Sequence, residues 1–586
     1  MCGIAGLMTG GGTSPPALIL DALTTALAHR GPDGHGRHMA GNVGLIQTRL
    51  AIIDLATGDQ PFLAADGTAL VANGEIYNDL ELRAEMAPDT RFATGSDCEP
   101  PLHLYRRLGV SFADRLRGMY AIAIHDPGTG RLVLARDPFG IKPLYIAESG
   151  AGFAFASEPQ ALIAAGLASP HLRRQSVLEL LQLQFTTGEE TPFADIRRVL
   201  PGETLVVEGG RIVARHRRAA LPSGEEARFL DEAEALAGLE AVLNDSIGVH
   251  RRADVPYGLF LSGGIDSSVV LAMMARQGGE RPVLAFTAAF PGTAAHDERE
   301  AARAVARAVG ADSVEVEFTE ADFWSSLPMV AAAMDDPAAD YAILPTFRLA
   351  AEARKSVKVI LSGEGGDELF GGYGRYRAAM RPWPFTRKMR RRGTFDGLGV
   401  LREPTTGWRD GIGAAERDGK REGHTRLQRA QALDCADWLP NDLLNKLDRC
   451  LMAHGVEGRV PFLDPVVAEF AFQLPDRLKI RKSLGKWLPR RWLAMELPAA
   501  RPFARKRGFT VPVGEWIAKA GRRLGPLVAV EPGIEELCRP DRVVALFADA
   551  GKQGFAAWTL LYYALWHRRH VLGKLPEGDV FETLGG

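Results

Sequence analysis

Cysteine is scarce in this chain, and its distribution excludes the usual cysteine-based sites. Five cysteines are spread over 586 residues without paired metal-ligand spacing, so no zinc site is indicated. An odd number in a long chain fits a reducing compartment, where disulfides are rare. The cysteines are Cys2, Cys98, Cys435, Cys450 and Cys538.

Long apolar runs and an excess of one charge are also missing. No window approaches the roughly 18 apolar residues of a membrane span, and the N-terminus lacks the charged flank and apolar core of a secretory signal. A net charge of −2 gives no electrostatic reason to bind nucleic acid or an anionic membrane. The basic run 387–392 lacks the interleaved aromatics of a stacking surface and is interpreted as a solvated segment. We expect a cytoplasmic protein without nucleic-acid or membrane partners.

The segment 261–268, Leu-Ser-Gly-Gly-Ile-Asp-Ser-Ser, is a glycine-rich turn without a lysine. It lies between a strand-like run, Tyr257 to Leu261, and a helix-like run, Val269 to Ala275. The backbone N–H groups of such a turn and the start of the helix suit a phosphate. The missing lysine excludes the phosphate-binding pattern of phosphoryl-transfer ATPases. Asp266 instead offers a carboxylate that can hold Mg²⁺ against phosphate oxygens.

The second residue is a cysteine, and this placement can supply both a nucleophile and its base. Removal of Met1 would leave the thiol and the α-amine of the chain on Cys2. The ordinary pKa is about 8.5 for a thiol and about 7.7 to 8.0 for an α-amine, so proton transfer between them costs only about 1 kcal/mol. Cys2 can therefore activate itself.

The chain is longer than a usual single domain, and its patterns change along its length. Up to about residue 205, strand-like runs alternate with Gly, Asp and Pro turns, and a helix-like run covers Ala17 to Ala28. A polar segment, Ala220 to Arg228, offers a boundary, and beyond it strands alternate with alanine-rich helices, as in parallel α/β units. The strand-like runs are Ala69 to Ala72, Met119 to His125, Leu132 to Ala135, Phe153 to Ala156, Val283 to Phe286 and Val357 to Leu361. The alanine-rich helix-like run is Glu298 to Val309.

Seven further strings, together with Cys2 and the turn at 261–268, carry a family resemblance. They are His29 to Gly34, Arg49 to Asp54, Asn73 to Asn78, Thr94 to Glu99, Arg136 to Tyr145, Ser362 to Tyr373 and Glu457 to Asp464. In this order they resemble the glutamine-hydrolysing asparagine synthetase family, in which a class II glutamine amidotransferase domain is joined to an ATP-pyrophosphatase domain. The resemblance implies an α+β domain over 2–205, with stacked antiparallel sheets of the N-terminal nucleophile hydrolase type. It implies an α/β domain of the ATP-pyrophosphatase type over 230–586, with a parallel sheet.

The resemblance also assigns a glutamine pocket in the first half. Cys2 would be the nucleophile, and Asn73 with the N–H of Gly74 would form the oxyanion hole, where losing one donor typically costs about 100-fold to 1000-fold in rate. The planar fork of an arginine suits the glutamine α-carboxylate, and an acid suits its α-ammonium. The residues implied to bind glutamine are Arg49, Asn73, Gly74, Glu75 and Asp97.

In the second half the resemblance implies an ATP site with Mg²⁺. Asp266 and Asp367 would hold the metal, Glu364 would take a proton from the incoming ammonia, and Lys506 would stabilise charge during adenylate formation. The segment 362–368 follows a predicted strand, at the end where open α/β sheets bind ligands. The implied ATP-binding residues are Leu261, Ser262, Gly263, Gly264, Asp266, Ser267, Ser268, Ser362 and Gly363.

The resemblance implies that glutamine, aspartate and ATP are the substrates, and it allows a homodimer. The closest alternative is an amidotransferase of the same type for another carboxylate, such as one on a cell-surface sugar or peptide. The string Asp335 to Tyr341 leaves this open, because Ala338 and Tyr341 depart from the family pattern there. A ring-closing relative, a tRNA-modifying enzyme and a non-catalytic scaffold fit less well. The first typically lacks the N-terminal cysteine, the second would show an RNA-binding module or redox cysteines, and the third would have lost site residues.

Overall fold

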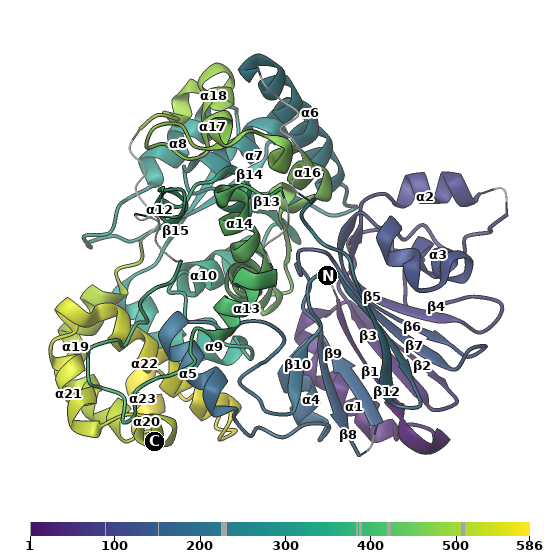
Figure 1. The fold of residues 1–586 in the computed structure, drawn as a ribbon, viewed down its shortest axis with the longest axis horizontal. Coiled ribbons are helices and arrows are strands. Elements are labelled where there is room, and N and C mark those ends of the chain that lie inside the picture. Colours follow the sequence, from purple (N-terminus) through teal and green to yellow (C-terminus); the bar gives the residue numbers. More distant parts are fainter. Residues whose placement is uncertain are drawn as a thin grey trace.

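The computed structural model describes residues 2–87, 89–150, 152–223, 231–279, 281–382, 385, 389–418, 423–504 and 510–586. In Figure 1 the N-terminal half, in purple and blue, lies beside the larger C-terminal half, in teal to yellow. The N-terminus lies where the two halves meet. None of the helices in these described ranges has both the length and the apolar character that a membrane span requires.

The N-terminal half contains two antiparallel sheets. Within the described residues each has six strands, in the orders β10-β8-β9-β1-β3-β2 and β12-β11-β7-β6-β5-β4. Their inner faces share one hydrophobic cluster, in which Ile4 and Val43 of one sheet meet Ala121 and Leu132 of the other. The sheets are therefore stacked, as predicted. Their strands are β1 Gly3–Thr9, β2 Gly34–Ala40, β3 Val43–Arg49, β4 Phe62–Leu63, β5 Ala69–Ile76, β6 Gly118–Asp126, β7 Arg131–Arg136, β8 Tyr145–Ser149, β9 Gly152–Ala156, β10 Ile196–Arg198, β11 Glu203–Glu208 and β12 Arg211–Arg217.

The helices of this half are short, and each strand-like run predicted for it lies within a strand. The helix expected over 17–28 ends earlier, at Ala26, and a 3₁₀ turn over Ala28–Arg30 follows it. That turn directs Arg30 into the interior, where its side chain is fully buried. The helices are α1 Ala17–Ala26, α2 Asp79–Met86, α3 Pro100–Leu108, α4 Pro159–Ala164 and α5 Arg174–Leu183.

The C-terminal half is built on a parallel sheet, as predicted. Its strand order within the described residues is β15-β14-β13-β16-β17, and each neighbouring pair is parallel. The strands are β13 Tyr257–Phe260, β14 Leu284–Ala289, β15 Asp312–Glu317, β16 Val359–Leu361 and β17 Glu457–Arg459. Because β13 and β16 are adjacent and parallel, the loops that follow them leave the same edge of the sheet. This edge brings the two predicted ATP-binding strings together.

The helices of the C-terminal half cover this sheet and extend into a separate helical group, α19 to α23, at the lower left of Figure 1. Three of them, α9, α14 and α23, begin with capping boxes at Thr319, Thr425 and Asp579. A π-helix over Asp434–Leu444 leads directly into α15. The helices are α6 Glu232–His250, α7 Ile265–Arg276, α8 Arg299–Ala308, α9 Glu320–Ala333, α10 Ile343–Ala353, α11 Gly366–Phe370, α12 Gly374–Ala379, α13 Asp410–Asp418, α14 Arg426–Leu433, α15 Asn445–Met452, α16 Pro465–Gln473, α17 Asp476–Lys479, α18 Trp487–Glu496, α19 Val513–Ala529, α20 Pro532–Leu537, α21 Pro540–Ala548, α22 Ala550–His570 and α23 Val580–Gly585.

Candidate functional site

Cys2 lies immediately before β1, at the junction of the two halves, and only 8% of the residue is exposed. Its backbone nitrogen donates to Oδ1 of Asn73 at 3.1 Å, and its carbonyl accepts from Nε of Arg30 at 3.2 Å. This nitrogen is a peptide nitrogen here and would become the α-amine on removal of Met1. Burial raises the pKa of the Cys2 thiol above its ordinary value. The thiol therefore needs help from neighbouring groups to ionise.

Asn73 and Gly74 lie on β5 beside Cys2, as the sequence predicted. Asn73 is fully buried, and its Nδ2 has no hydrogen-bond partner among the residues that the structure describes. A buried amide donor left unused is costly unless a ligand takes it up. A Cβ on Gly74 would lie 2.1 Å from the carbonyl oxygen of Met119, so only glycine lets β5 and β6 approach this closely. The pair offers an unused donor next to the thiol.

Glu75 and Asp97 are buried acids where the sequence predicts the glutamine pocket. Burial raises the pKa of Glu75 well above its ordinary value, although Arg459 lowers it, and Asp97 and Glu457 raise it further. Burial also raises the pKa of Asp97 to about 6, although Oδ2 of this residue accepts a 2.6 Å hydrogen bond from the N–H of Ile76. A cation brought into this pocket would stabilise both carboxylates in their charged form.

Arg49 ends β3, and its guanidinium is almost buried, with 9% of the side chain exposed. It pairs with Asp59 at 2.6 Å through Nη1 and donates to the carbonyl of Asp54 at 2.5 Å through Nη2. Asp59 is 80% exposed, so this pair is easily exchanged for another anion. The guanidinium is therefore available for an anionic ligand at the edge of the pocket.

Gln47 was not identified from the sequence, yet it contacts the thiol directly. It lies on β3, is 1% exposed, and donates from Nε2 to Sγ of Cys2 at 2.9 Å. An N–H donor at this distance stabilises the thiolate relative to the thiol. No string marks this residue, because a glutamine inside a strand is usually only a polar side chain.

We predict that Gln47→Leu slows alkylation of Cys2 by iodoacetamide at neutral pH. A hydrogen bond to a charged group is worth about 1.5 to 3 kcal/mol, so the thiolate population should fall about 10-fold or more. The measurement is the rate of Cys2 modification against pH, followed by mass spectrometry. Gln160→Leu, which lies at the junction but away from the thiol, serves as the matched control. An unchanged profile for Gln47→Leu would remove Gln47 from this role.

In the C-terminal half, the turn between β13 and α7 has the shape of an anion site. Gly263 has a φ of +65°, and a Cβ there would lie only 3.0 Å from Cβ of Ala301 on α8, so glycine suits this position. Gly264 is the N-cap of α7, and its N–H donates to Oγ of Ser262 at 3.3 Å. The turn therefore places two serine hydroxyls, which bond to each other, and the helix N-terminus at the same sheet edge.

Asp266 and Asp367 converge on one ammonium group, that of Lys486. Nζ of Lys486 lies 2.8 Å from Oδ1 of Asp367 and is also paired with Asp266, and 4% of the lysine side chain is exposed. Gly366 is required here, because its Cβ would lie 2.5 Å from Oδ1 of Asp266. Lys486 was missed from the sequence. Its only local signal, a φ of +56° at the N-cap of α18, is visible only in the structure.

Glu364 lies in the loop after β16, at the same edge of the sheet, and is half-buried. Burial raises its pKa above the ordinary value, Lys446 lowers it, and Asp340, Asp367 and Asp266 raise it. Lys446, on α15, pairs with Oδ2 of Asp340 at 2.9 Å. A carboxylate with a raised pKa beside an ammonium suits proton transfer near neutral pH. Lys506 lies outside the described residues, as do positions 387 and 388 of the basic run.

The string Asp335 to Tyr341 divides between two places. Asp340 faces Lys446, near Glu364, whereas Asp335 and Asp336 are buried against the N-terminal half. Asp336 pairs with Arg198 at 2.6 Å and accepts a 2.7 Å hydrogen bond from the hydroxyl of Tyr145. The first two acids of this string therefore hold the two halves together.

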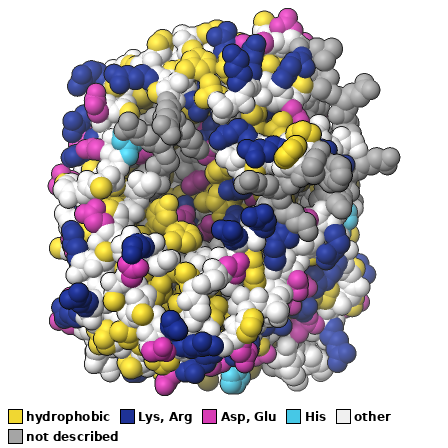
Figure 2. Space-filling model, turned by 60° about the vertical axis from the view of Figure 1, so that its left-hand side comes forward, with side chains coloured by type: hydrophobic (Ala, Val, Ile, Leu, Met, Phe, Trp, Pro, Cys, Tyr) yellow, Lys and Arg dark blue, Asp and Glu magenta, His cyan; other side chains and the backbone are white. Residues whose placement is uncertain are grey.

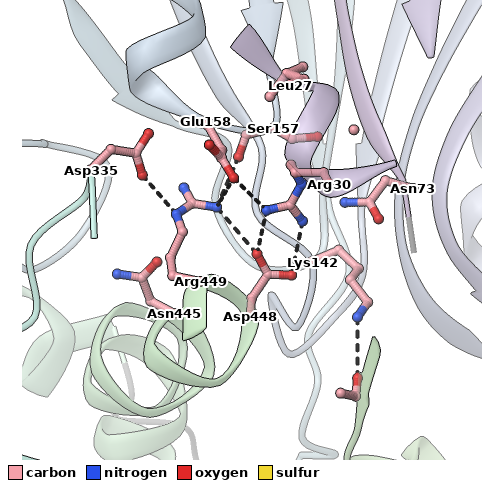
Figure 3. Close-up of polar contacts among 12 residues, drawn as sticks. Leu27, Arg30, Asn73, Lys142, Ser157, Glu158, Asp335, Asn445, Asp448 and Arg449 are labelled. Carbon is pink, nitrogen blue, oxygen red and sulfur yellow. Dashed lines mark hydrogen bonds and ion pairs between the residues drawn. The ribbon is translucent and has the colours of Figure 1, made fainter. Parts of the chain in front are cut away.

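A buried group of charges, which we call the junction cluster, occupies this boundary (Figure 3). Arg30 donates two hydrogen bonds, of 2.8 and 3.1 Å, to the carboxylate of Asp448. Arg449 reaches Asp335 at 2.7 Å, and Glu158 accepts from Arg30 at 2.7 Å. Because Arg30 also donates to the carbonyl of Cys2, the cluster connects the thiol site to α15. Its members are Arg30, Glu158, Asp335, Asp448 and Arg449.

Figure 2 shows the molecule turned so that the side of the C-terminal half comes forward. A hollow lies near the centre of this face. Acidic and hydrophobic side chains lie inside the hollow, and lysine and arginine side chains lie around it. An opening of this kind, with cations around acids, suits a ligand that carries negative charge together with a metal ion.

Comparisons with known proteins agree with both halves. A family model described as a glutamine amidotransferase domain matches residues 1–217, and one described as asparagine synthase matches residues 238–568. A Mycobacterium tuberculosis protein, provisionally named a glutamine-hydrolysing asparagine synthetase, is 35% identical and aligns over 92% of each chain. Asparagine synthetase (glutamine-hydrolysing) 1 of Bacillus subtilis is 31% identical over 98% of each chain. Asparagine synthetase B of Escherichia coli is 30% identical over 84% of this chain and 79% of its own. The chain described here belongs to the asparagine synthase family.

Proposed function

We propose that this protein makes asparagine from aspartate, using ATP and ammonia released from glutamine. The products would be asparagine, AMP, pyrophosphate and glutamate, formed through a β-aspartyl-AMP intermediate. The observation that carries the proposal is the joint presence of a buried N-terminal thiol site and an Asp266–Lys486–Asp367 group at a parallel sheet edge. The names of the family and of the relatives support the choice of substrates.

In the first half-reaction, Sγ of Cys2 attacks the side-chain amide carbon of glutamine. The α-amine freed by removal of Met1 takes the thiol proton and returns it to the leaving ammonia. The unused Nδ2 of Asn73, with the N–H of Gly74, would stabilise the oxyanion. Asp97 and Glu75 would bind the α-ammonium, and Arg49 would exchange Asp59 for the α-carboxylate. Water then releases glutamate from the thioester.

In the second half-reaction, the turn at Ser262 to Ser268 and the start of the Ser362 loop would hold the phosphates of ATP. Transfer of AMP to the aspartate side chain turns its oxygen into a leaving group. Ammonia then attacks the carbonyl carbon, Glu364 accepts the proton that the new ammonium must lose, and AMP departs. Lys486 would move from its acid partners to phosphate oxygens, and Lys506 is proposed to stabilise charge as the adenylate forms.

The acid pair fits a magnesium ion. Asp266 and Asp367 already converge on one positive charge, and carboxylates with phosphate oxygens are the ligands that Mg²⁺ prefers. When bound, the ion would neutralise phosphate charge. The two carboxylates would hold it against the nucleotide, and the ammonium of Lys486 would be released to the pyrophosphate oxygens.

The acceptor is tested by measuring ATP-dependent pyrophosphate release with a panel of carboxylates. We expect aspartate alone to trigger release and glutamine or ammonium salts to convert the adenylate to asparagine. Glutamate, N-acetylaspartate and uronic acids serve as matched acceptors that change chain length, ammonium or scaffold. If another carboxylate triggers pyrophosphate release and aspartate does not, the protein carries out the same chemistry on that acceptor and does not make asparagine.

A further inference from the structure

Arg459 has no role in the chemistry above. It belongs to the string Glu457 to Asp464, which is one of the strings that carry the family resemblance. It ends β17, the last strand in the order of the parallel sheet, and is fully buried. Its carbonyl accepts a 2.8 Å hydrogen bond from the N–H of Ser362. Ser362 begins the loop that carries Glu364, so the backbone of Arg459 fixes the start of that loop.

The side chain of Arg459 points the other way, into the N-terminal half. Nη2 lies 3.1 Å from Oε1 of Glu75, and Nε donates to Oε1 of Glu457 at 2.5 Å. Nη1 donates to the carbonyls of His250 and Arg252, at 2.8 and 2.7 Å. Hydrogen bonds from Nε and Nη1 to three groups fix the orientation of the planar guanidinium, and Nη2 forms an ion pair with Glu75 without a hydrogen bond. The guanidinium therefore places a fixed positive charge beside Glu75.

One residue therefore touches both sites, with its side chain on the glutamine pocket and its backbone on the acceptor loop. Resting on the proposed function, we propose that Arg459 is a positioning residue that holds Glu75 for glutamine binding and ties the glutamine pocket to the Glu364 loop. In its absence glutamine would bind weakly, and ammonia release would be less closely matched to amide formation.

The charges around Glu75 explain why the pocket needs this arginine. Loss of the guanidinium would leave Glu75 and Glu457 as buried carboxylates without their shared cation, and such groups take up protons. A protonated Glu75 no longer attracts the α-ammonium of glutamine. The titratable and charged groups that face Glu75 come from both halves, and they are Cys2, Tyr77, Asp97, Cys98, Glu457 and Arg459.

The direction of the pH effect follows from these charges. Burial raises the pKa of Glu75, and Arg459 opposes this rise. Without Arg459 the pKa of Glu75 rises further. When the pH is lowered, Glu75 then takes up its proton at a higher pH than in the unsubstituted protein. The acid limb of kcat/KM for glutamine hydrolysis should therefore move to higher pH. A purely structural role would not move this limb.

The test compares Arg459→Gln and Arg459→Lys with the unsubstituted protein and with Arg117→Gln. Arg117 pairs with Asp464 across the same junction at 2.8 Å but touches neither Glu75 nor Ser362, so its loss controls for a weakened junction. Four quantities are measured for each protein. They are KM for glutamine hydrolysis without ATP or aspartate, the pH dependence of kcat/KM for this hydrolysis, the ratio of glutamate to asparagine with all substrates, and asparagine synthesis from ammonium chloride.

For Arg459→Gln we expect KM for glutamine to rise about 10-fold to 100-fold, because the loss of one partner leaves the buried carboxylate of Glu75 without its cation. The glutamate to asparagine ratio should rise, the acid limb should shift upward, and synthesis from ammonium should stay within about 3-fold. Arg459→Lys keeps the charge and should show the same changes to a smaller extent, which also covers the case that Arg459→Gln does not fold.

Three results would overturn the proposal. They are an unchanged KM and acid limb in both variants, changes no larger than those of Arg117→Gln, or a parallel loss of ammonium-dependent synthesis. The hydrolysis arm uses no acceptor. If the unsubstituted protein hydrolyses glutamine but makes no asparagine, the proposed synthesis fails while the role of Arg459 in the pocket is still decided by KM and pH.

Discussion

Cys2→Ala should abolish glutamine-dependent asparagine synthesis while synthesis from ammonium salts persists. A nucleophile in a covalent mechanism commonly accounts for about 10,000-fold or more of the rate, so hydrolysis should fall to background. The proposed ATP site lies on the edge of a separate parallel sheet, so its chemistry should not need the thiol. The measurement is glutamate release beside asparagine formation, with glutamine or ammonium chloride as the nitrogen source.

Cys538→Ala is the matched control, because Cys538 is also buried but lies at the C-cap of α20, in the helical group. It should keep both activities. Retained glutamine hydrolysis in a homogeneous Cys2→Ala preparation would defeat the assignment of the nucleophile. An uncleaved N-terminal tag should mimic part of the effect, because it keeps the backbone nitrogen of Cys2 in a peptide bond.

Glu364→Gln should lower amide formation about 100-fold to 10,000-fold, the usual range for loss of a general base. The change is nearly isosteric, so it removes proton acceptance while keeping the shape of the loop. It is best measured in the Cys2→Ala background with ammonium chloride, which isolates the C-terminal chemistry. Pyrophosphate release recorded beside asparagine formation then separates adenylation from amide formation.

If Glu364 acts on ammonia, pyrophosphate release should continue while asparagine falls. Loss of both would place Glu364 with the nucleotide or metal instead, and unchanged amide synthesis would exclude both roles. Glu368→Gln is the matched control. Burial raises the pKa of Glu368 to about 8, so its neutral amide resembles the form present at neutral pH, and the 2.8 Å bond from Tyr373 can be kept.

The layers of the fold were predictable because they depend on local patterns. The run Met119 to His125 lies inside β6, and the glycine turn after β13 falls at the strand and helix boundary expected for it. Local patterns are less informative about ends. The helix from Ala17 stops at Ala26, and β12 continues the N-terminal sheet to Arg217, past the boundary expected at 205. The domain boundaries themselves stay a prediction.

The site was predictable where a string marks it and missed where contacts cross the sequence. The structure brings together Cys2, Asn73 and Glu75 at one place, and Asp266 and Asp367 at another. Gln47 contacts Cys2, 45 residues away, and Lys486 contacts two acids, one of them 220 residues away, and no local pattern encodes such distances. The assigned catalytic roles are hypotheses for the experiments above.

The buried pairs across the junction limit how this protein can be rebuilt. Arg198 meets Asp336 and Arg30 meets Asp448, and each partner belongs to a different half of the chain. Removing one member of a buried pair typically costs about 3 to 5 kcal/mol, which is comparable to much of the stability of a domain. A chimaera that takes its amidotransferase half from another enzyme must therefore import both sides of each pair. Replacing one half alone would leave buried charges of the other half without their partners.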